Sequence, residues 1–227
     1  MRFQTTLEDI INCDQERYVR RISYEEVKPF LLNIHYARRI PCITDAFGLI
    51  YEGKLIGIVT YGIPASHSLC IGLAGEENQD NIKELNRLCL LPEYNGNNNA
   101  SFLVGKSLKL LDNGTFVVSY ADTAWGHYGD IYQATNFLYT GKTKERTDKF
   151  VDGGHSRHYE KFEGSGLRQS RSAKHRYIYL VGDKRTKKRM LSELKYKIQP
   201  YPKGKDTRYN VDDPVPIIKT QITKERI

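Results

Sequence analysis

The chain contains no apolar run close to the roughly 20 residues that a membrane-spanning helix needs. Its first 18 residues, MRFQTTLEDIINCDQERY, place acids where a signal peptide would need an apolar stretch, so we expect no secretion signal. Cysteine is scarce: the four residues are scattered, with no Cys-x-x-Cys pair. This pattern favours reduced, mostly buried thiols over a zinc knuckle or a disulfide framework. Together these absences predict a cytoplasmic protein with no membrane partner.

Tryptophan is also scarce, with 1 residue, whereas tyrosine is abundant, with 16. The apolar fraction of 39% is low for a folded protein, but 227 residues are long enough to bury a core. The length fits one domain with extensions or two small domains. A soluble fold with a polar, aromatic-rich surface is therefore expected, and a disordered chain is excluded.

The positive charge is concentrated in one part of the chain. Residues 142–208 contain 20 Lys and Arg against 8 Asp and Glu, and within them the bases alternate with aromatic and small polar residues. Cations contact phosphates and flat rings stack on bases, so this composition indicates a polyanionic partner such as nucleic acid. A solvated basic surface is the alternative. The candidate contact residues are Arg157, Lys161, Arg168, Arg171, Lys174, Arg176, Lys184, Lys187, Lys188 and Arg189.

Hydrophobic periodicity and turn residues predict alternating helices and strands. Such an order indicates an α/β or α+β sheet with helices on its faces. Helices are expected over residues 24–34, 101–111 and 183–194, with a short one beginning at 130. Strands are expected over 46–52, 54–62, 83–91, 115–121 and 174–181, with one more reaching residue 140. Residues 64–81 and 93–100 are expected to be loops, and 200–227 an extended tail.

Residues 118–141, VSYADTAWGHYGDIYQATNFLYTG, resemble the signature of the Mom family of phage DNA-modification proteins. Two further pieces occur in the family's order: ELNRL at 84–88, followed by a helix that begins SFLVGK, and the upstream His35-Tyr36 with Pro41. The family modifies adenine and so protects phage DNA from restriction. It is similar in fold to the GNAT acyltransferases.

The resemblance implies a GNAT-like mixed central sheet with helices on both faces and a basic C-terminal extension. We expect residues 1–145 to form the first part of the catalytic core, 146–199 a basic nucleic-acid-binding segment that completes or extends it, and 200–227 a tail. The implied function is that of a phage or prophage enzyme. It would transfer an acyl-derived, carbamoylmethyl- or glycinamide-like group to the N6 amine of adenine in double-stranded DNA. A non-catalytic DNA-binding relative and an acetyl-CoA-dependent N-acetyltransferase acting on another amine are the alternatives.

The resemblance also implies a donor site. In a GNAT, backbone amides at the start of the helix after the loop hold the donor's pyrophosphate. The corresponding residues here are Asn97, Asn98, Asn99, Ala100 and Ser101. They lack the usual basic residue and the two closely spaced glycines, which argues against ordinary acetyl-CoA binding. The donor is left open, with an acyl-CoA and an aminoacyl-type donor as the two choices.

Adenine N6 is a weak nucleophile, so an enzyme must orient it, accept its proton and neutralise charge on the donor. His35, Asp122 and His127 are the candidate bases or orienting partners. Each has a structural alternative: a helix-terminal histidine for His35, a cap or turn for Asp122 and a glycine-flanked loop for His127.

Tyr132 occupies the place of the GNAT tyrosine that protonates the leaving group, with core packing as the alternative. Ser119 is expected to face the same cleft. Arg87 is either a substrate clamp or an ion-pair partner of a nearby glutamate, and Tyr36 and Tyr120 are candidate substrate contacts.

A metal is not expected. His35, His127 and Asp122 have the composition of a two-histidine, one-carboxylate iron site. Their spacing gives no support for one, because no His-x-Asp or HExxH motif occurs.

Overall fold

The structure is a computed structural model that describes residues 17–149, 167–206 and 223–224. Seven strands form one sheet in the order β1-β2-β3-β4-β5-β9-β6, in which only the pair β4 and β5 is parallel. The strands are β1 (Arg17–Arg21), β2 (Asp45–Tyr51), β3 (Lys54–Gly62), β4 (Ile82–Leu90), β5 (Phe116–Asp122), β6 (Leu138–Lys142) and β9 (Lys174–Leu180). The basic segment therefore contributes β9 to the interior of the sheet, between β5 and β6.

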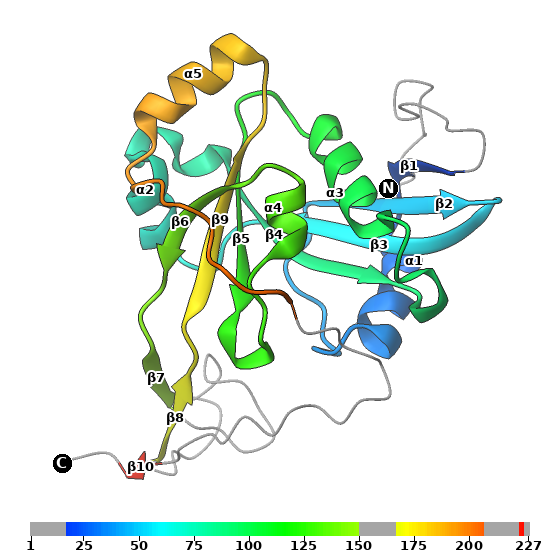
Figure 1. The fold of residues 1–227 in the computed structure, drawn as a ribbon, viewed down its shortest axis with the longest axis horizontal. Helices are drawn as coiled ribbons and strands as arrows, with labels where there is room; N and C mark the ends of the chain where they lie inside the picture. Colours follow the sequence, from blue (N-terminus) through cyan, green and yellow to red (C-terminus); the bar gives the residue numbers. More distant parts are fainter. Residues whose placement is uncertain (1–16, 150–166, 207–222, 225–227) are drawn as a thin grey trace.

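Helices cover both faces of this sheet (Figure 1). Along β5, residues alternate between a cluster that contains α3 and one that contains α2 and α5. The α-helices are α1 (Tyr24–Pro29), α2 (His67–Ala74), α3 (Asn99–Ser107), α4 (Asp130–Ala134) and α5 (Lys184–Glu193). The expected mixed central sheet with helices on both faces is confirmed.

Local sequence explains the main boundaries. A capping box starts α1, because Ser23 accepts from the backbone of Glu26 while the Glu26 carboxylate accepts from the backbone of Ser23. The helix expected to residue 34 continues past Pro29 as a π-helical turn, Phe30–Ile34. Glu52 and Gly53, with φ of 47° and 76°, form the tight turn between β2 and β3 that a type I′ hairpin requires.

Residues 64–81 are not a loop, and that expectation is wrong. They form α2 and a 3-10 helix, Glu76–Asn81. Ser66 caps α2 by accepting from Leu69 N at 3.3 Å, and Cys70 and Leu73 bury its inner side. The side chains of α2 are small, so the sequence alone does not show that they pack against the sheet.

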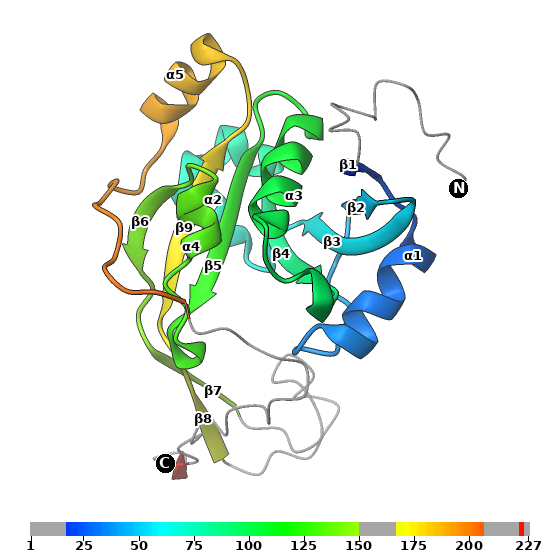
Figure 2. The ribbon, with the colours of Figure 1, turned by 45° about the vertical axis from the view of Figure 1, so that its right-hand side comes forward.

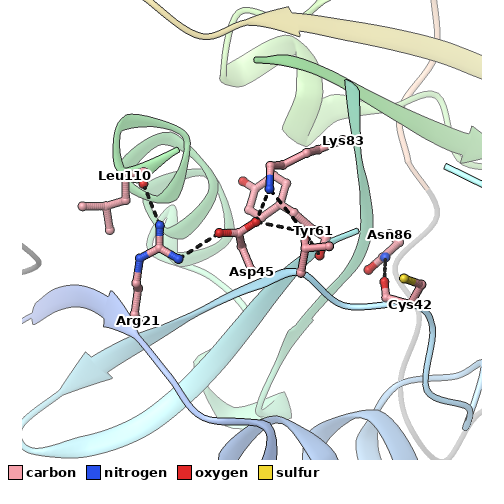
Figure 3. Close-up of polar contacts among 8 residues, drawn as sticks. Arg21, Cys42, Asp45, Tyr61, Lys83, Asn86 and Leu110 are labelled. Atoms are coloured by element: carbon pink, nitrogen blue, oxygen red, sulfur yellow. Dashed lines mark hydrogen bonds and ion pairs between the residues drawn. The ribbon is translucent and has the colours of Figure 1, made fainter. Parts of the chain in front are cut away.

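A carboxylate network joins the edge of the sheet to the end of α3 (Figure 3). Asp45, on β2, accepts from Arg21 Nη1 at 2.8 Å and from Lys83 Nζ at 2.5 Å. Arg21 also donates to the carbonyl of Leu110, at the end of the helical segment after α3. Burial alone would raise the pKa of Asp45, but hydrogen bonds from Lys83 and Arg21 outweigh burial and keep that pKa below its usual value. One carboxylate thus ties β1, β2 and β4 together.

The first part of the expected tail packs on the core. We call residues 199–206 the C-terminal strap. Gln199 N donates to Tyr139 O at 2.9 Å, and Tyr201 Oη donates to Phe137 O at 2.8 Å. At its end, the Asp206 carboxylate accepts from three consecutive backbone amides, those of residues 128, 129 and 130, at the start of α4. The strap therefore fixes the loop that leads into α4.

A second, small sheet extends from the large one (Figures 1 and 2). It contains β7 (Arg146–Lys149), β8 (Leu167–Arg171) and β10 (Thr223–Lys224), in the order β10-β8-β7. Strand β7 follows β6 and β8 precedes β9, so this sheet continues two strands of the core.

Candidate functional site

The parallel pair β4–β5 separates after a short stretch. It is paired only from Ile82↔Phe116 to Glu84↔Val118. Just past the last pair, Ser119 Oγ donates to Leu85 O at 2.9 Å across the opening. The strands pair no further, and candidate residues from four segments gather there.

Tyr132, on α4, reaches this opening from the α3 side of the sheet. Its hydroxyl lies 2.8 Å from Ser119 Oγ. Ser119 Oγ is the donor in this contact as well, so its one proton is shared between the Leu85 carbonyl and the Tyr132 oxygen, and the proton of the phenol is used in neither bond. Burial raises the pKa of Tyr132 to about 12, so it carries its proton at neutral pH. Such a phenol can donate a proton to a leaving group.

His35 ends the π-helical turn after α1 and is buried. Its Nδ1 accepts from Ala37 N at 3.0 Å, which leaves the proton on Nε2. Burial, together with the charges of Arg87 and Arg39, lowers the pKa of His35 to about 3. The ring is therefore neutral at physiological pH and suits orientation of a group better than acceptance of a proton.

Tyr36 connects His35 to the end of β5. Its ring stacks on His35 with centroids 4.4 Å apart and lies 4.8 Å from the ring of Trp125. Burial raises the pKa of Tyr36, Arg87 opposes that shift and Asp122 adds to it, so both charges act on this phenol. Trp125 was not among the sequence candidates, although it is the chain's only tryptophan and lies three positions after Asp122.

Arg87 lies on β4 beside a bulge. Strand β3 pairs Thr60 with Arg87 but Tyr61 with Leu85, so Asn86 is the extra residue. The Asn86 amide donates to Cys42 O at 2.8 Å, which holds the segment that follows Tyr36 against the sheet.

The guanidinium of Arg87 is half-buried. Burial, followed by the charge of Arg39, lowers its pKa. Its Nη1 donates to Asn86 O at 2.6 Å, while its buried Nε has no hydrogen-bond partner in the described part of the chain. A buried donor without an acceptor is costly, so this group is well suited to receive an oxygen of a ligand.

Asp122 is the last residue of β5, and its carboxylate caps a helix and binds two side chains. Its carboxylate accepts from Ala124 N at 3.0 Å and caps the 3-10 helix Thr123–Trp125. It also accepts from Ser172 Oγ and Lys174 Nζ, each at 2.5 Å. Burial would raise the pKa of Asp122, but these hydrogen bonds and the Lys174 charge lower it below its usual value. The residue is a carboxylate at neutral pH.

Two other sequence candidates are placed differently. Tyr120 points to the opposite face from Ser119, into the cluster with α2 and Tyr196, where burial raises its pKa. The structure does not bring it to the site. His127 lies in the loop before α4, and its backbone N donates to Asp122 O at 3.2 Å. That bond places the loop beside the carboxyl end of β5.

The donor candidates form the turn into α3. Asn97 and Asn98 adopt positive φ of 46° and 58°, a region that asparagine tolerates. Arg17 Nη1 donates to Asn97 O at 3.0 Å and to Asn99 Oδ1 at 2.9 Å, which ties this turn to β1. Ser101 Oγ donates to Asn98 O at 3.0 Å, and Ala100 packs against the core.

An open groove of about 390 Å³ runs along α3, past this turn, to the turn after α4. Asn98, Ser101 and Phe102 line one wall, and Asn136 and Tyr179 line the other. It does not reach Ser119 or Asp122, so it adjoins the donor turn rather than the polar cluster.

The DNA-binding candidates fall into two groups. Arg171 and Lys174 belong to the extension of the sheet, where they pair with Asp148 at 2.7 Å and with Asp122. Lys184, Lys187, Lys188 and Arg189 lie on α5. Arg176 is half-buried, with its guanidinium carbon 3.3 Å from the ring centroid of Tyr196. Arg168 is on β8, and Arg157 and Lys161 lie outside the described residues.

Within the described residues, no group of three or more His, Cys, Asp and Glu could hold a metal ion. In the same part of the chain, no helix is long and apolar enough to cross a membrane.

Fold and site define an α/β protein in which a mixed sheet parts between β4 and β5 around a tyrosine, an arginine and a carboxylate. The model of the Mom protein family matches residues 16–203, and the chain belongs to that family. It is 27% identical over 207 residues to the methylcarbamoylase mom of Escherichia phage Mu, covering 83% of this chain and 85% of that protein.

Solved acetyltransferase structures share less sequence identity with this chain than the phage Mu relative does. The ribosomal-protein-S18-alanine N-acetyltransferase of Escherichia coli is 9% identical with a TM-score of 0.45, over 74% of this chain and 95% of that one. Arabidopsis thaliana NAA60, solved with acetyl-CoA, is 13% identical with a TM-score of 0.46, over 73% and 99%.

Proposed function

We propose that this protein is a phage or prophage DNA-modification transferase. It transfers an acyl-derived, carbamoylmethyl- or glycinamide-like group to the N6 amine of adenine in double-stranded DNA. It acts in the cytoplasm of a bacterial host and protects the DNA from restriction. Membership of the Mom family and the named activity of the phage Mu relative support the reaction class.

One observation carries the proposal. The signature segment supplies both Ser119 and Tyr132, which meet at 2.8 Å where β4 and β5 part. Tyr36 acts electrostatically on Tyr132 and is itself acted on by Arg87, whose buried Nε has no hydrogen-bond partner among the described residues. A group transfer needs a proton for the leaving group and a cation for charge that develops on the donor. Tyr132 supplies the first and Arg87 the second.

The remaining residues orient the reactants. Neutral His35 presents Nε2–H as a donor, and Tyr36 and Trp125 offer aromatic faces. Asp122 lies three positions before Trp125, and its charge acts on Tyr36. In our proposal it orients the amine, stabilises the positive charge that develops as N6 attacks, and accepts the proton that N6 loses as the new N–C bond forms and the bond to the leaving group breaks.

The donor is an acyl-CoA or an aminoacyl-type molecule whose phosphates meet the turn 97–101. The amides that open α3 and the adjoining groove suit such an anion. Because Asn97, Asn98, Asn99 and Ala100 stand where GNATs have a basic residue and two closely spaced glycines, we propose a donor held differently from acetyl-CoA in those enzymes.

The test is to express the protein in a bacterium that carries a plasmid, digest the plasmid to nucleosides and analyse them by mass spectrometry. A new adenosine derivative, present only with the intact protein, would establish the reaction, and its mass would identify the group. Tyr132→Phe is expected to lower its yield by roughly 10²-fold, the usual effect of losing a general acid.

Tyr51→Phe is the matched control, because it removes the same hydroxyl from β2, where the ring packs against Tyr94. Its yield should equal that of the wild type. Equal yields from both variants would contradict the role of Tyr132. A product on a non-DNA amine, or DNA binding with no new nucleoside, would instead support the acetyltransferase or the non-catalytic alternative.

A further inference from the structure

The extension formed by β7 and β8 is a narrow, positively charged ribbon. We call residues 142–149 with 167–174 the basic ribbon. They contain seven Lys and Arg against two Asp and Glu. The two strands are antiparallel, in register from Arg146↔Arg171 to Lys149↔Arg168.

The ribbon is joined firmly to the core. At its base, Thr143 N donates to Lys174 O, and Lys174 N donates to Thr143 Oγ1, both at 2.9 Å. Asp148 forms ion pairs with Arg171 Nε at 2.7 Å and with Arg146 Nε at 3.7 Å, so one of the two acids is neutralised within the ribbon. Strand β10 adds a third strand only beside residues 167 and 168.

The base of the ribbon is also part of the candidate site. Ser172 lies just before β9 and Lys174 is the first residue of β9. Both side chains donate to the Asp122 carboxylate. Both views show the ribbon leaving the body beyond the carboxyl end of β5, where Asp122 lies (Figures 1 and 2). A partner held along the ribbon would therefore meet Asp122.

Helix α5, the other basic element, lies at the far end of the sheet. It follows β9, whose last residue, Leu180, pairs with Phe116 at the start of β5. The whole length of β5 separates α5 from Asp122. The ribbon, not α5, is placed to guide a partner into the site.

The dimensions favour one groove of DNA. Two paired strands lie about 4.8 Å apart, and four or five residues extend about 14–17 Å. The major groove, about 12 Å wide, admits a two-stranded ribbon with its side chains, whereas a minor groove of about 6 Å would have to be widened to hold one. The N6 amine of adenine is displayed in the major groove.

We infer that the basic ribbon enters the major groove of double-stranded DNA and so brings the site to the groove edge that carries N6. The occupant is duplex DNA, since the ribbon's charge complements phosphate on both sides of the groove. The inference rests on the proposed function for the identity of the target amine, but the choice of groove is tested separately.

The first experiment measures binding of the full-length wild type to a short duplex by fluorescence anisotropy. Methyl green, a major-groove ligand, is expected to displace the protein, and netropsin, a minor-groove ligand, is not. The reverse result would overturn the inference whether or not any variant folds.

The second experiment compares two double variants with the same change in net charge. Lys144→Ala with Arg146→Ala removes two exposed cations of the ribbon. Lys28→Ala with Lys54→Ala removes two exposed cations, one from α1 and one from the first residue of β3. The ribbon variant should make the slope of log Kobs against log salt less steep by about 2, one unit for each lost phosphate contact, and the control should not. Equal slopes for the two variants would overturn the inference.

Nucleoside analysis of the same samples separates the two proposals. Displacement by methyl green without a modified nucleoside would leave the groove assignment in place and count against the proposed function. A modified nucleoside whose formation is blocked by netropsin alone would support the proposed function and overturn the groove assignment.

Discussion

Replacing Asp206 by alanine is expected to release the loop that leads into α4. The carboxylate accepts from Gly129 N at 2.8 Å, from Asp130 N at 3.2 Å and from Tyr128 N. In return, Asp206 N donates to Asp130 Oδ2 at 3.1 Å. The C-terminal strap and the start of α4 thus hold each other, and α4 carries Tyr132.

The magnitude follows from these contacts. A hydrogen bond to a charged group contributes about 1.5–3 kcal/mol. The bonds to Asp206 are partly exposed and share one carboxylate, so we expect a total of about 2 kcal/mol rather than the sum. That free energy corresponds to a change of roughly 30-fold in a local opening equilibrium. Opening of the loop requires only the strap to detach, so the thermal midpoint should change little.

Hydrogen exchange followed by NMR measures this opening directly. In Asp206→Ala the amides of Tyr128, Gly129 and Asp130 should exchange roughly 30-fold faster, while those of β2 and β3 keep their wild-type rates. Lys205→Ala is the control, since it alters the neighbouring strap residue and leaves the carboxylate in place. Unchanged exchange at the three amides would refute the idea that the strap fixes this loop.

Two further predictions concern buried ionisable groups. Asp45→Asn should destabilise the fold by roughly 2–3 kcal/mol in urea unfolding, less than the 3–5 kcal/mol of a fully buried pair, because the Arg21 and Lys83 side chains are 33% and 23% exposed. Since the folded pKa of Asp45 is lowered, its stabilisation is complete above the ordinary value of about 3.9 and is lost as pH falls through the folded value. An unchanged urea midpoint in Asp45→Asn would contradict this account. The folded pKa of His35 is about 3. The contribution of its neutral ring to the stability of the fold is therefore complete above about pH 6.5 and declines as pH falls toward 3. Between pH 7.5 and 5 the wild type should therefore lose about 1–2 kcal/mol more stability than His35→Gln, and parallel losses would show that His35 is not buried as a neutral ring.

The sequence predicted those strands and helices that are determined by their own apolar pattern and turn residues. The strands at 46–52 and 54–62 are continuous apolar runs around a Glu-Gly turn, and both are present within one or two residues. Strand β1 was not predicted, because Val19 is its only buried residue and an edge strand needs no more. Helix α2 was missed because its small side chains become a core only against the sheet.

The candidate site was predictable to a similar degree. Ser119 and Tyr132 lie 13 positions apart in the segment that carries the resemblance, and the structure brings their hydroxyls together. The contact of Asp122 with Lys174 joins residues 52 positions apart, and that of Asp206 with the start of α4 spans 76 or more. Local periodicity carries no information on such pairs. They follow from β9 returning beside β5 and from the strap crossing β6.

The short pairing of β4 with β5 also divides the molecule along its sequence. All strands before residue 112 lie on one side of that seam, together with α3, and β5, β9 and β6 lie on the other. A cut in the turn at Asn113 would therefore separate the chain into two fragments that each keep their own strand ladders. If the two fragments are fused to partners that associate on demand, the proposed DNA modification would report that association.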